Sequence, residues 1–354
     1  MLDVRESQLK AWGLFLFSGV LLAACAAGPS SVPLGDPLTG VPAMDRLGGP
    51  PLPDFENFDR AGIDVVKGGF PPGRQPDGNT IILASSEGLI VFDTGRHRFH
   101  TQKIIDHAQA AGRPLIAIIN SHWHLDHISG NVPLREQFPG AAIYNHGAAL
   151  ENALRTFLAR GRESNAKMLE DPTLTPELID EITIDAATVE QGEWLKPTIS
   201  IDQAQVITIG GRRLEFHTAS GASDGDVWVF DPASGVLMTG DLVTLPAPFL
   251  DTPCPKAWST ALEEILATPF VRAIPGHGRE MTRADIALYR DAFNALINCA
   301  QGAAEPLICA DAWTAAAAPL QENPELDNPY ARGMSRNYVE NVLRKDGVRE
   351  DCLA

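Results

Sequence analysis

The stretch that decides the fold and chemistry of this chain is Asn120-Ser121-His122-Trp123-His124-Leu125-Asp126-His127-Ile128. It places three imidazoles and one carboxylate within six positions, in a chain that has only nine histidines. Histidine is the commonest nitrogen ligand of zinc, and a carboxylate adds an oxygen ligand. If the stretch leaves a strand as an extended turn, His122 and His124 face one point, while Asp126 and His127, past a bend, face a second point nearby. We therefore predict that it holds two adjacent metal ions, or one ion with a polar surround.

The residues before this stretch predict a buried strand that leads into it. The run 115–119 is apolar throughout, which is typical of a strand buried on both faces. An α/β sheet usually places its chemistry at the carboxyl ends of such strands. Earlier in the chain, strand patterns cover 63–67, 79–83 and 88–92, and a helical spacing of apolar residues covers 98–111.

The residues after the stretch predict a second set of strands and helices. We expect a helix that begins near Ser129, a strand over 141–144, and a helical insertion over 147–185 that covers the sheet edge or the site. Further strands are expected over 198–201, 205–209, 213–217, 226–230, 236–238 and 271–274, and further helices over 257–267, 284–300 and 336–345. Two halves that each combine strands with helices predict an α/β sandwich with helices outside.

Two short motifs after apolar strands carry further ligand types. Thr239-Gly240-Asp241 would place a carboxylate on a turn at the end of a strand. Pro275-Gly276-His277-Gly278 would place an imidazole there, and its glycines let the backbone approach a metal closely. Each motif alone is more typical of an ordinary turn than of a metal site. Together with the histidine stretch, they indicate a metal centre.

In this order the motifs resemble those of the metallo-β-lactamase superfamily, namely His-x-His-x-Asp-His, Gly-His-Thr, Gly-Asp and Gly-His. The resemblance covers residues 62–300 and implies an αββα sandwich and bound zinc. It implies that His122 and His124 bind a first metal, that a second metal is bound by Asp126, His127 and His277, and that Asp241 bridges the two. It also implies that Asp93, in Asp93-Thr94-Gly95, braces the histidine loop from behind.

One position departs from the family pattern. The Gly-His-Thr motif falls on Gly221-Ala222-Ser223, so Ala222 stands where the third histidine of the first site is expected. Replacement by His217, Asp224 or Asp226 stays open. The second site keeps three protein ligands, which with a water make an open catalytic zinc site. We therefore expect one firmly bound zinc ion and a weaker or absent second one.

The resemblance implies a zinc-dependent hydrolase that acts on an ester, lactone, lactam or similar small molecule. Zinc would activate a water molecule, and Asp126 would accept or deliver its proton. The fold does not select the substrate. A true β-lactamase and a non-catalytic metal-binding or partner-binding protein are the alternatives. The net charge of −17 argues against nucleic acid as a partner.

Residues 1–24 have the pattern of a bacterial lipoprotein signal peptide. Arg5 and Lys10 precede an apolar run that ends in Leu22-Ala23-Ala24-Cys25, which resembles a lipobox. We expect Cys25 to be lipidated and to anchor the chain facing the periplasm, and Ala26 favours the outer membrane of a Gram-negative bacterium. An ordinary signal peptide or an uncleaved anchor is the alternative. Residues 25–60, rich in proline and glycine, are expected to form a tether.

The folded domain is expected over 61–300, followed by a helical extension over 301–354. An oxidising periplasm favours disulfides, and the short separation makes Cys299–Cys309 the natural pair, which leaves Cys254–Cys352. Four cysteines nevertheless allow three pairings. The isolated histidines are interpreted as surface or packing residues: His97, His100, His107 and His146.

Overall fold

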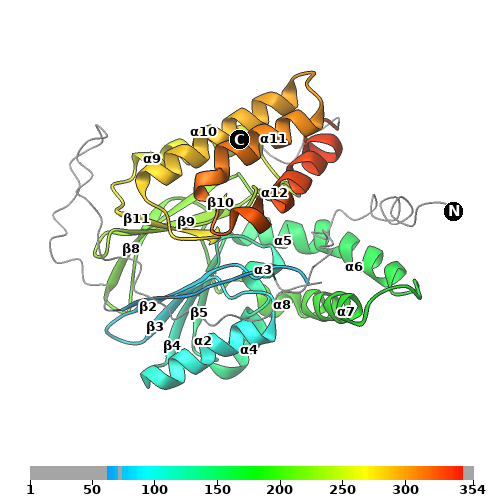
Figure 1. Ribbon diagram of the computed structural model, residues 1–354. Helices are drawn as coiled ribbons and strands as arrows, with labels where there is room; N and C mark the ends of the chain where they lie inside the picture. Colours follow the sequence, from blue (N-terminus) through cyan, green and yellow to red (C-terminus); the bar gives the residue numbers. More distant parts are fainter. Residues whose placement is uncertain (1–61, 71–73, 346–354) are drawn as a thin grey trace.

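The computed structural model describes residues 62–70 and 74–345. Two β-sheets pack face to face, and helices cover the outer side of each sheet (Figure 1). The predicted αββα sandwich is therefore confirmed. In order across the sheet, the first consists of β1 (Ile63–Val66), β2 (Thr80–Ala84), β3 (Leu89–Phe92), β4 (Leu115–Ile119), β5 (Ala142–Asn145) and β6 (Ile199–Ser200).

The second sheet has five strands in the described part of the chain. Their order is β11 (Arg272–His277), β10 (Val236–Thr244), β9 (Asp226–Asp231), β8 (Arg212–Ala219) and β7 (Gln205–Ile209). Strands β3 to β6 pair in parallel, and so do β10 and β11. Because β4 and β11 both deliver ligand motifs at their carboxyl ends, the sandwich can bring those motifs together at one edge.

The central strands are buried on both faces, which explains their continuous apolar sequence. In β2, Ile81 and Leu83 pack in the core between the sheets, whereas Ile82 packs in the core beneath the outer helices. The same division holds for β3, where Ile90 and Val91 belong to different cores. Successive side chains of a strand point to opposite faces, and here both faces pack in an apolar layer, so neither face is exposed to solvent.

Helices of the two halves cover opposite sides of the sandwich (Figure 1). On the first sheet lie α2 (Arg98–Ala111) and α4 (Asn131–Gln137), which pack on the outer core of that sheet. The second sheet is covered by α9 (Pro255–Ala267), α10 (Arg283–Gln301), α11 (Pro306–Ala317) and α12 (Pro324–Tyr338), with a 3-10 helix η2 (Ala318–Leu320) before α12 and a π-helix η3 (Val339–Leu343) after it. None of the helices within residues 62–70 and 74–345 combines the length and apolar character that crossing a membrane needs.

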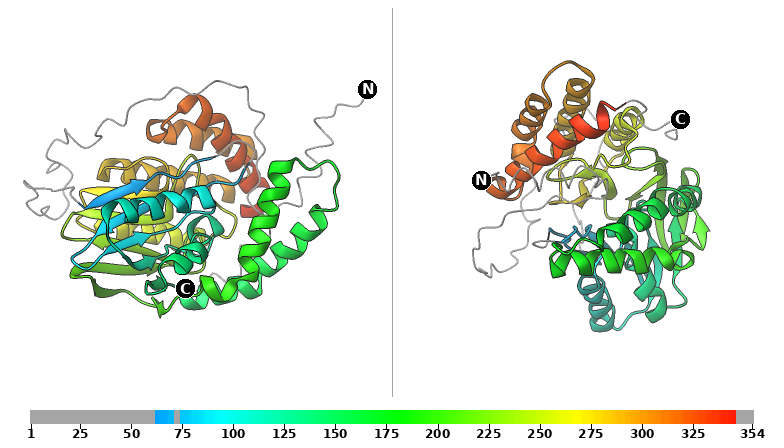
Figure 2. Two further views of the ribbon diagram at one scale, coloured as in Figure 1. Left: turned by 90° about the horizontal axis from the view of Figure 1, so that it is seen from below. Right: turned by 90° about the vertical axis from the view of Figure 1, so that its right-hand side faces the viewer.

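The segment after β5 is helical and stands at the side of the sandwich. It consists of α5 (Gly147–Arg155), α6 (Phe157–Met168), α7 (Pro176–Glu190) and the short α8 (Gly192–Leu195). Helices α6 and α7 lie side by side and project away from the sheets (Figure 2). Helix therefore continues to residue 195, ten positions beyond the predicted end.

Two predicted boundaries are wrong, whereas the helix expected near Ser129 is α4, which begins at residue 131. A further helical turn, α3 (Leu125–Ile128), precedes it inside the histidine stretch and buries Leu125 and Ile128. Strand β10 continues through a bulge at Gly240, so Asp241 lies within it and not on a turn after it. Helix α12 begins at residue 324 instead of 336, since an internal Pro329 and a polar composition obscure its apolar period.

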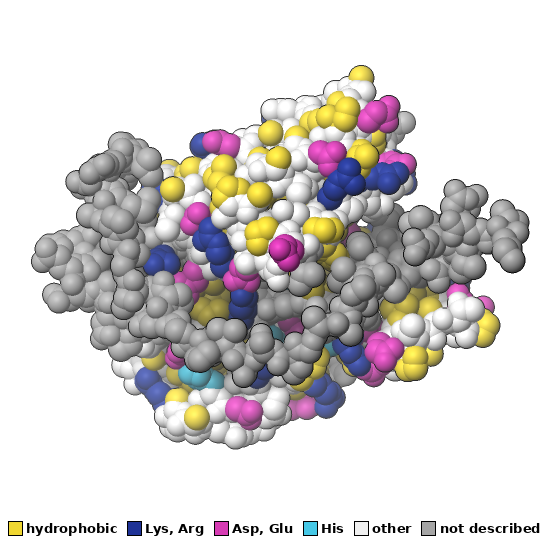
Figure 3. Space-filling view, in the orientation of Figure 1, with side chains coloured by type: hydrophobic (Ala, Val, Ile, Leu, Met, Phe, Trp, Pro, Cys, Tyr) yellow, Lys and Arg dark blue, Asp and Glu magenta, His cyan; other side chains and the backbone are white. Residues whose placement is uncertain are grey.

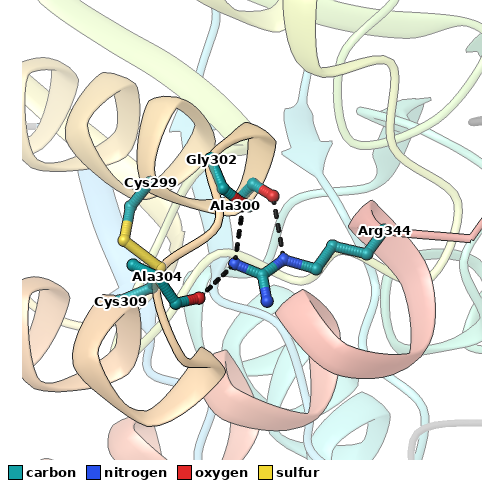
Figure 4. The surroundings of a disulfide bond; sticks show 6 residues. All are labelled: Cys299, Ala300, Gly302, Ala304, Cys309 and Arg344. Carbon is teal, nitrogen blue, oxygen red and sulfur yellow. Dashed lines mark hydrogen bonds between the residues drawn. A yellow bond between two sulfur atoms is a disulfide. The ribbon is translucent and has the colours of Figure 1, made fainter.

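The predicted Cys299–Cys309 disulfide is present and joins α10 to α11 (Figure 4). The Arg344 guanidinium donates hydrogen bonds to carbonyl oxygens in the loop that this bond closes, those of Gly302 and Ala304. The predicted Cys254–Cys352 pair stays a prediction, because Cys352 lies outside the described residues. Cys25 and the segments 1–24 and 25–60 also lie outside them.

Candidate metal centre

All six predicted ligands meet at the edge of the sandwich. The second group, which matches the predicted second site, consists of four buried residues, Asp126 and His127 in α3, Asp241 in β10 and His277 at the end of β11. The first group consists of His122, His124 and the same Asp241. In each group the candidate ligand atoms lie within 4.8 Å of one another. The structure thus assembles the two sets of side chains that the sequence motifs suggested.

Asp241 lies between the two groups with one oxygen toward each. Its Oδ1 is 3.3 Å from His127 Nε2 and 3.6 Å from His277 Nε2. Its Oδ2 is 3.9 Å from His122 Nε2. Both Asp241 oxygens, His122 Nε2 and His127 Nε2 are buried without a hydrogen-bond partner among the described residues. Unpaired buried polar atoms are costly, and a cation among them would satisfy all four. Imidazole nitrogens with carboxylate oxygens are a donor set that fits zinc.

Asp93 holds the histidine loop through three hydrogen bonds. Its carboxylate accepts from the Ser121 backbone N–H (2.7 Å), the Ser121 hydroxyl (2.8 Å) and His127 Nδ1 (2.8 Å). Ser121 Oγ in turn lies 2.9 Å from His122 Nδ1. Because these bonds place the ring proton of both histidines on Nδ1, each Nε2 keeps its lone pair for a metal. Asp93 does this with a φ of 60°, a conformation uncommon for a non-glycine residue.

We expect Asp93→Asn to lower zinc affinity about 10- to 100-fold, because the carboxamide can turn its NH2 group toward His127 and disturb the tautomer. Competition with a chromophoric chelator measures this affinity. The exposed Asp202, in the loop between β6 and β7, provides the control variant Asp202→Asn, which should bind zinc like the unaltered protein. Equal affinities for all three proteins would contradict a role for Asp93 in holding the ligands.

The charges around the cluster favour a cation. Burial acts to lower the pKa of His127, but the carboxylates of Asp241, Asp126 and Asp93 outweigh it and raise that pKa well above its usual value. Burial conversely acts to raise the pKa of Asp126, yet His127 and His277 hold it well below its usual range. Burial likewise acts to raise the pKa of Asp241, and His127 and His277 again lower it, so Asp126 and Asp241 are the charges that attract a cation into the cluster.

Two glycines are required by the close packing of the cluster. A Cβ at Gly276 would lie 2.0 Å from Asp241 Oδ1, and one at Gly78 would lie 2.6 Å from His127 Cε1. Both distances are shorter than side chains tolerate, so any other residue at either position would displace a candidate ligand. The requirement at Gly276 follows from the motif, whereas Gly78, before β2, is not apparent from the sequence.

Ala222 is buried and brings no donor atom to the first group. The turn around it is held by Asp226, whose carboxyl accepts from the backbone N–H of Gly221 and of Ser223, and burial raises the pKa of Asp226 to about 8. Thr252 links this turn to the cluster, since its hydroxyl donates to the Ala222 carbonyl and lies 2.9 Å from His124 Nε2. That contact orients His124 and leaves Nδ1 as its atom for a metal.

The structure places the three suggested replacements for the missing histidine outside both groups. The His217 ring stacks on Trp228 with centroids 3.8 Å apart. Asp224 accepts hydrogen bonds from Trp123 Nε1 and Asn152. Within the described residues, neither these two nor Asp226 belongs to a group that could hold a metal. The first group therefore keeps two histidines and the shared carboxylate.

The isolated histidines also lie outside both groups. His100 is buried against the Thr80 hydroxyl, and His146 accepts a hydrogen bond at the start of α5. His97 has a larger role: its Nδ1 lies 2.8 Å from Asp77 Oδ2, and its Nε2 lies 2.8 Å from Glu181 Oε1 on α7. His97 therefore joins the sandwich to the helical segment.

Arg96 connects that segment to the metal cluster. Its Nη1 lies 2.7 Å from both carboxylate oxygens of Asp185 on α7, and its Nη2 lies 3.9 Å from Asp126 Oδ1. Sequence reasoning missed this network. A usable signal was the spacing of Glu181 and Asp185, which lie four residues apart and so share one face of α7 with the buried Ile182.

We expect the stability supplied by His97 to decrease as pH rises. Burial alone would lower the pKa of His97, but Asp77 and Glu181 outweigh it and raise the pKa to about 9. A raised pKa adds stability that is complete below the unfolded-state pKa of about 6.5 and is lost as pH rises to about 9, a change of about 3 kcal/mol. Urea unfolding over this range should show a steeper decline for the unaltered protein than for His97→Gln.

The control for this prediction is His107→Gln, because His107 is partly exposed and lies 3.5 Å from an exposed Asp64 carboxylate. It should retain the full decline. The same decline in His97→Gln and in the unaltered protein would show that His97 is not the group responsible.

A cleft lies between the metal cluster and the α6–α7 pair. His124 and Asp126 line its inner end. Its walls are largely apolar and include Trp123, Phe157, Met168, Leu178, Ile182 and Phe249. A molecule that entered it would meet the cluster on one side and apolar side chains on the other.

Comparisons with known proteins agree with the motifs. Residues 73–309 match the sequence profile of the Metallo-beta-lactamase superfamily. The chain is 25% identical over 245 residues to a linear primary-alkylsulfatase from Pseudomonas sp. (strain ATCC 19151), an alignment that covers 60% of this chain and 44% of that protein. It is 21% identical over 140 residues to a hydroxyacylglutathione hydrolase from Synechococcus sp. (strain JA-3-3Ab), which covers 40% of this chain and 39% of that protein. The chain thus spans less than half the length of both relatives.

Solved structures of similar proteins include a lactamase and a sulfatase. A metallo-beta-lactamase from Pontibacter korlensis has a TM-score of 0.48 at 17% identity and covers 66% of this chain and 94% of its own. The stereoselective inverting sec-alkylsulfatase Pisa1 from Pseudomonas sp. also has a TM-score of 0.48, at 19% identity, and covers 76% of this chain and 48% of its own.

Proposed function

Because this chain belongs to the metallo-beta-lactamase superfamily, we propose that it is a zinc-dependent hydrolase of an ester, lactone, lactam or similar small molecule. The observation that carries the proposal is the disposition of Asp241, whose two unpaired oxygens face two separate groups of buried ligand atoms. A carboxylate with one oxygen toward each ligand group suits a metal centre at which a substrate oxygen could also bind the metal.

Zinc, when bound, would lower the pKa of a water molecule and polarise the substrate oxygen. Asp126, His127 and His277 with Asp241 would hold the firmly bound ion. Asp126 is also the proposed proton acceptor, and Arg96 and His277 on either side fix the orientation of its carboxylate. His122 and His124 would hold a second ion only weakly, because Ala222 supplies no third imidazole.

Metal analysis tests the stoichiometry. After dialysis against a mild chelator, one zinc ion per chain is expected to remain, and a second should bind only from added zinc. Two ions retained through dialysis would contradict the weak first site.

The walls of the cleft favour a substrate with an apolar group. Phe157 and Leu178 from the α6–α7 pair and Phe249 from the sandwich provide an apolar surface beside the ligands. A panel of nitrophenyl esters, lactones, thioesters, alkyl sulfates and nitrocefin, each assayed with zinc and with chelator, tests the proposal. Turnover of at least one class that disappears with chelator is expected, and turnover of nitrocefin alone would identify a true β-lactamase.

The alternative is a metal-binding or partner-binding protein without catalysis, which Ala222 favours. This alternative would be correct if Asp126→Ala abolished zinc binding while the whole panel showed no zinc-dependent turnover. Where described side chains are visible in Figure 3, acidic and basic residues are interspersed.

We also propose that the chain is a lipoprotein anchored through Cys25 and facing the periplasm. The lipobox-like Leu22-Ala23-Ala24-Cys25 supports this. In a Gram-negative host, the full chain should incorporate labelled palmitate and fractionate with the outer membrane, whereas Cys25→Ser should incorporate none. Equal labelling of Cys352→Ser and the unaltered chain provides the control, and unlabelled full-length protein would contradict the anchor.

A further inference from the structure

We infer that Asp251, held by Tyr338 of the C-terminal helices, transfers a proton to the leaving group in the hydrolysis proposed above. The inference rests on that proposed function and adds a residue that no motif of the sequence indicates. Asp251 lies in the loop between β10 and α9.

Asp251 lies beside the metal cluster without belonging to it. It lines the same cleft as His124 and Asp126. Phe249, two residues earlier, packs against the His277 ring with centroids 5.0 Å apart. Within the described residues, neither group that could hold a metal includes Asp251. Its carboxylate is therefore close to the reaction site and is not required to hold the ion.

The Tyr338 side chain fixes the position of this carboxylate. The Tyr338 hydroxyl donates a 2.8 Å hydrogen bond to Asp251 Oδ2, and the ring is buried. The hydrogen bond from Tyr338 occupies Oδ2, so Oδ1 is the Asp251 oxygen that would accept and donate the transferred proton. A carboxylate fixed in the cleft beside the candidate metal ligands is in a position suited to general acid–base catalysis.

The helix that carries Tyr338 lies beyond the part of the chain that matches the family profile. That match ends at residue 309, whereas α12 begins at Pro324. Tyr330, also on α12, contacts the Phe70 ring at 5.3 Å, and Phe70 lies 5.8 Å from the His277 ring. The C-terminal helices therefore form part of the wall of the centre as well as covering the second sheet.

For an ester, the proposed step conserves protons and electrons. The attacking water gives one proton, through Asp126 as the acceptor proposed above, to the Asp251 carboxylate in the same cleft and bonds through its oxygen to the carbonyl carbon. The bond from that carbon to the alcohol oxygen then breaks, its electron pair stays on the alcohol oxygen, and the proton passes from Asp251 to that oxygen. The carboxylate begins and ends ionised, and no redox partner is needed.

The proton transfer from Asp251 to the alcohol oxygen distinguishes a catalytic role of Asp251 from a structural one. A zinc-activated water can also lose its proton to solvent, but an alkoxide leaves slowly unless it is protonated. A nitrophenolate leaves without a proton. The dependence of the rate on the leaving group therefore reports on Asp251 separately from the integrity of the metal site.

The experiment compares ethyl butyrate with 4-nitrophenyl butyrate for the unaltered protein and Asp251→Asn, both loaded with zinc. We expect kcat/KM for the ethyl ester to fall about 100-fold or more, and that for the nitrophenyl ester to fall less than about 10-fold. Tyr338→Phe should show the same selectivity with a smaller loss. Tyr144→Phe is the matched control, because Tyr144 lies in the core between the sheets and does not line the cleft, and it should keep the selectivity of the unaltered protein. Zinc content should be the same in all four proteins.

Equal losses on both esters, or loss of zinc from Asp251→Asn, would overturn the inference and leave the proposed hydrolase intact. If the unaltered protein hydrolyses neither ester in a zinc-dependent manner, the ester hydrolase proposal fails, and the proton transfer fails with it. The two failures are thus told apart by the unaltered protein.

Discussion

Asp241→Asn is expected to lose firmly bound zinc and to reduce zinc-dependent turnover about 1000-fold or more, since a metal ion supplies several kcal/mol of transition-state stabilisation. Asp241 is the residue shared by both ligand groups. A carboxamide removes the negative charge and replaces one of the two oxygens by an NH2 group, which donates hydrogen bonds but has no free lone pair to bind a metal. The loss should therefore affect both groups at once.

The measurement is zinc content after dialysis, together with turnover of whichever substrate of the panel is hydrolysed. Asp226→Asn is the matched control, because Asp226 is equally buried in the same region and belongs to neither group. It should keep its zinc. Full zinc content in Asp241→Asn would show that Asp241 is not a ligand and would remove the observation on which the proposed function depends.

The sequence predicted the sandwich and the meeting of the six ligand candidates because those features are local. Each ligand lies in or directly after an apolar strand or its turn, and parallel strands bring their carboxyl ends to one edge of a sheet. The double-sided burial of 115–119 was apparent from its unbroken apolar run, and β4 has those bounds. Strand registers and the ends of helices needed tertiary packing, as at Gly240 in β10 and at Pro324 in α12.

What the sequence could not show are contacts between charged residues far apart in the chain. Arg96 and Asp185 are separated by 89 positions, and Asp251 and Tyr338 by 87. Each of these residues alone resembles an ordinary surface charge or a core tyrosine. The sequence showed only that Ala222 lacks the imidazole expected at its position. The structure adds that Thr252 connects the Ala222 carbonyl to His124.

Arg96→Met is expected to destabilise the protein by about 3–5 kcal/mol, the usual cost of leaving a buried charge without its partner. Only 6% of the Arg96 side chain and 13% of the Asp185 side chain is exposed. Without the guanidinium, the Asp185 carboxylate has no bidentate partner and remains near the carboxylate of Glu181. The pKa of Asp185 is already raised by burial, so that carboxylate depends on Arg96 for compensation.

Urea unfolding of the zinc-saturated protein measures this cost, and the double variant Arg96→Met/Asp185→Leu tests its origin. Replacing both members of a buried ion pair by apolar residues is often neutral, so the double variant should recover most of the lost stability. The exposed pair Arg332–Asp311 supplies the control, because Arg332→Met should cost less than about 1 kcal/mol. A double variant no more stable than Arg96→Met would show that Arg96 acts through Asp126 instead, and zinc affinity should then fall in both variants.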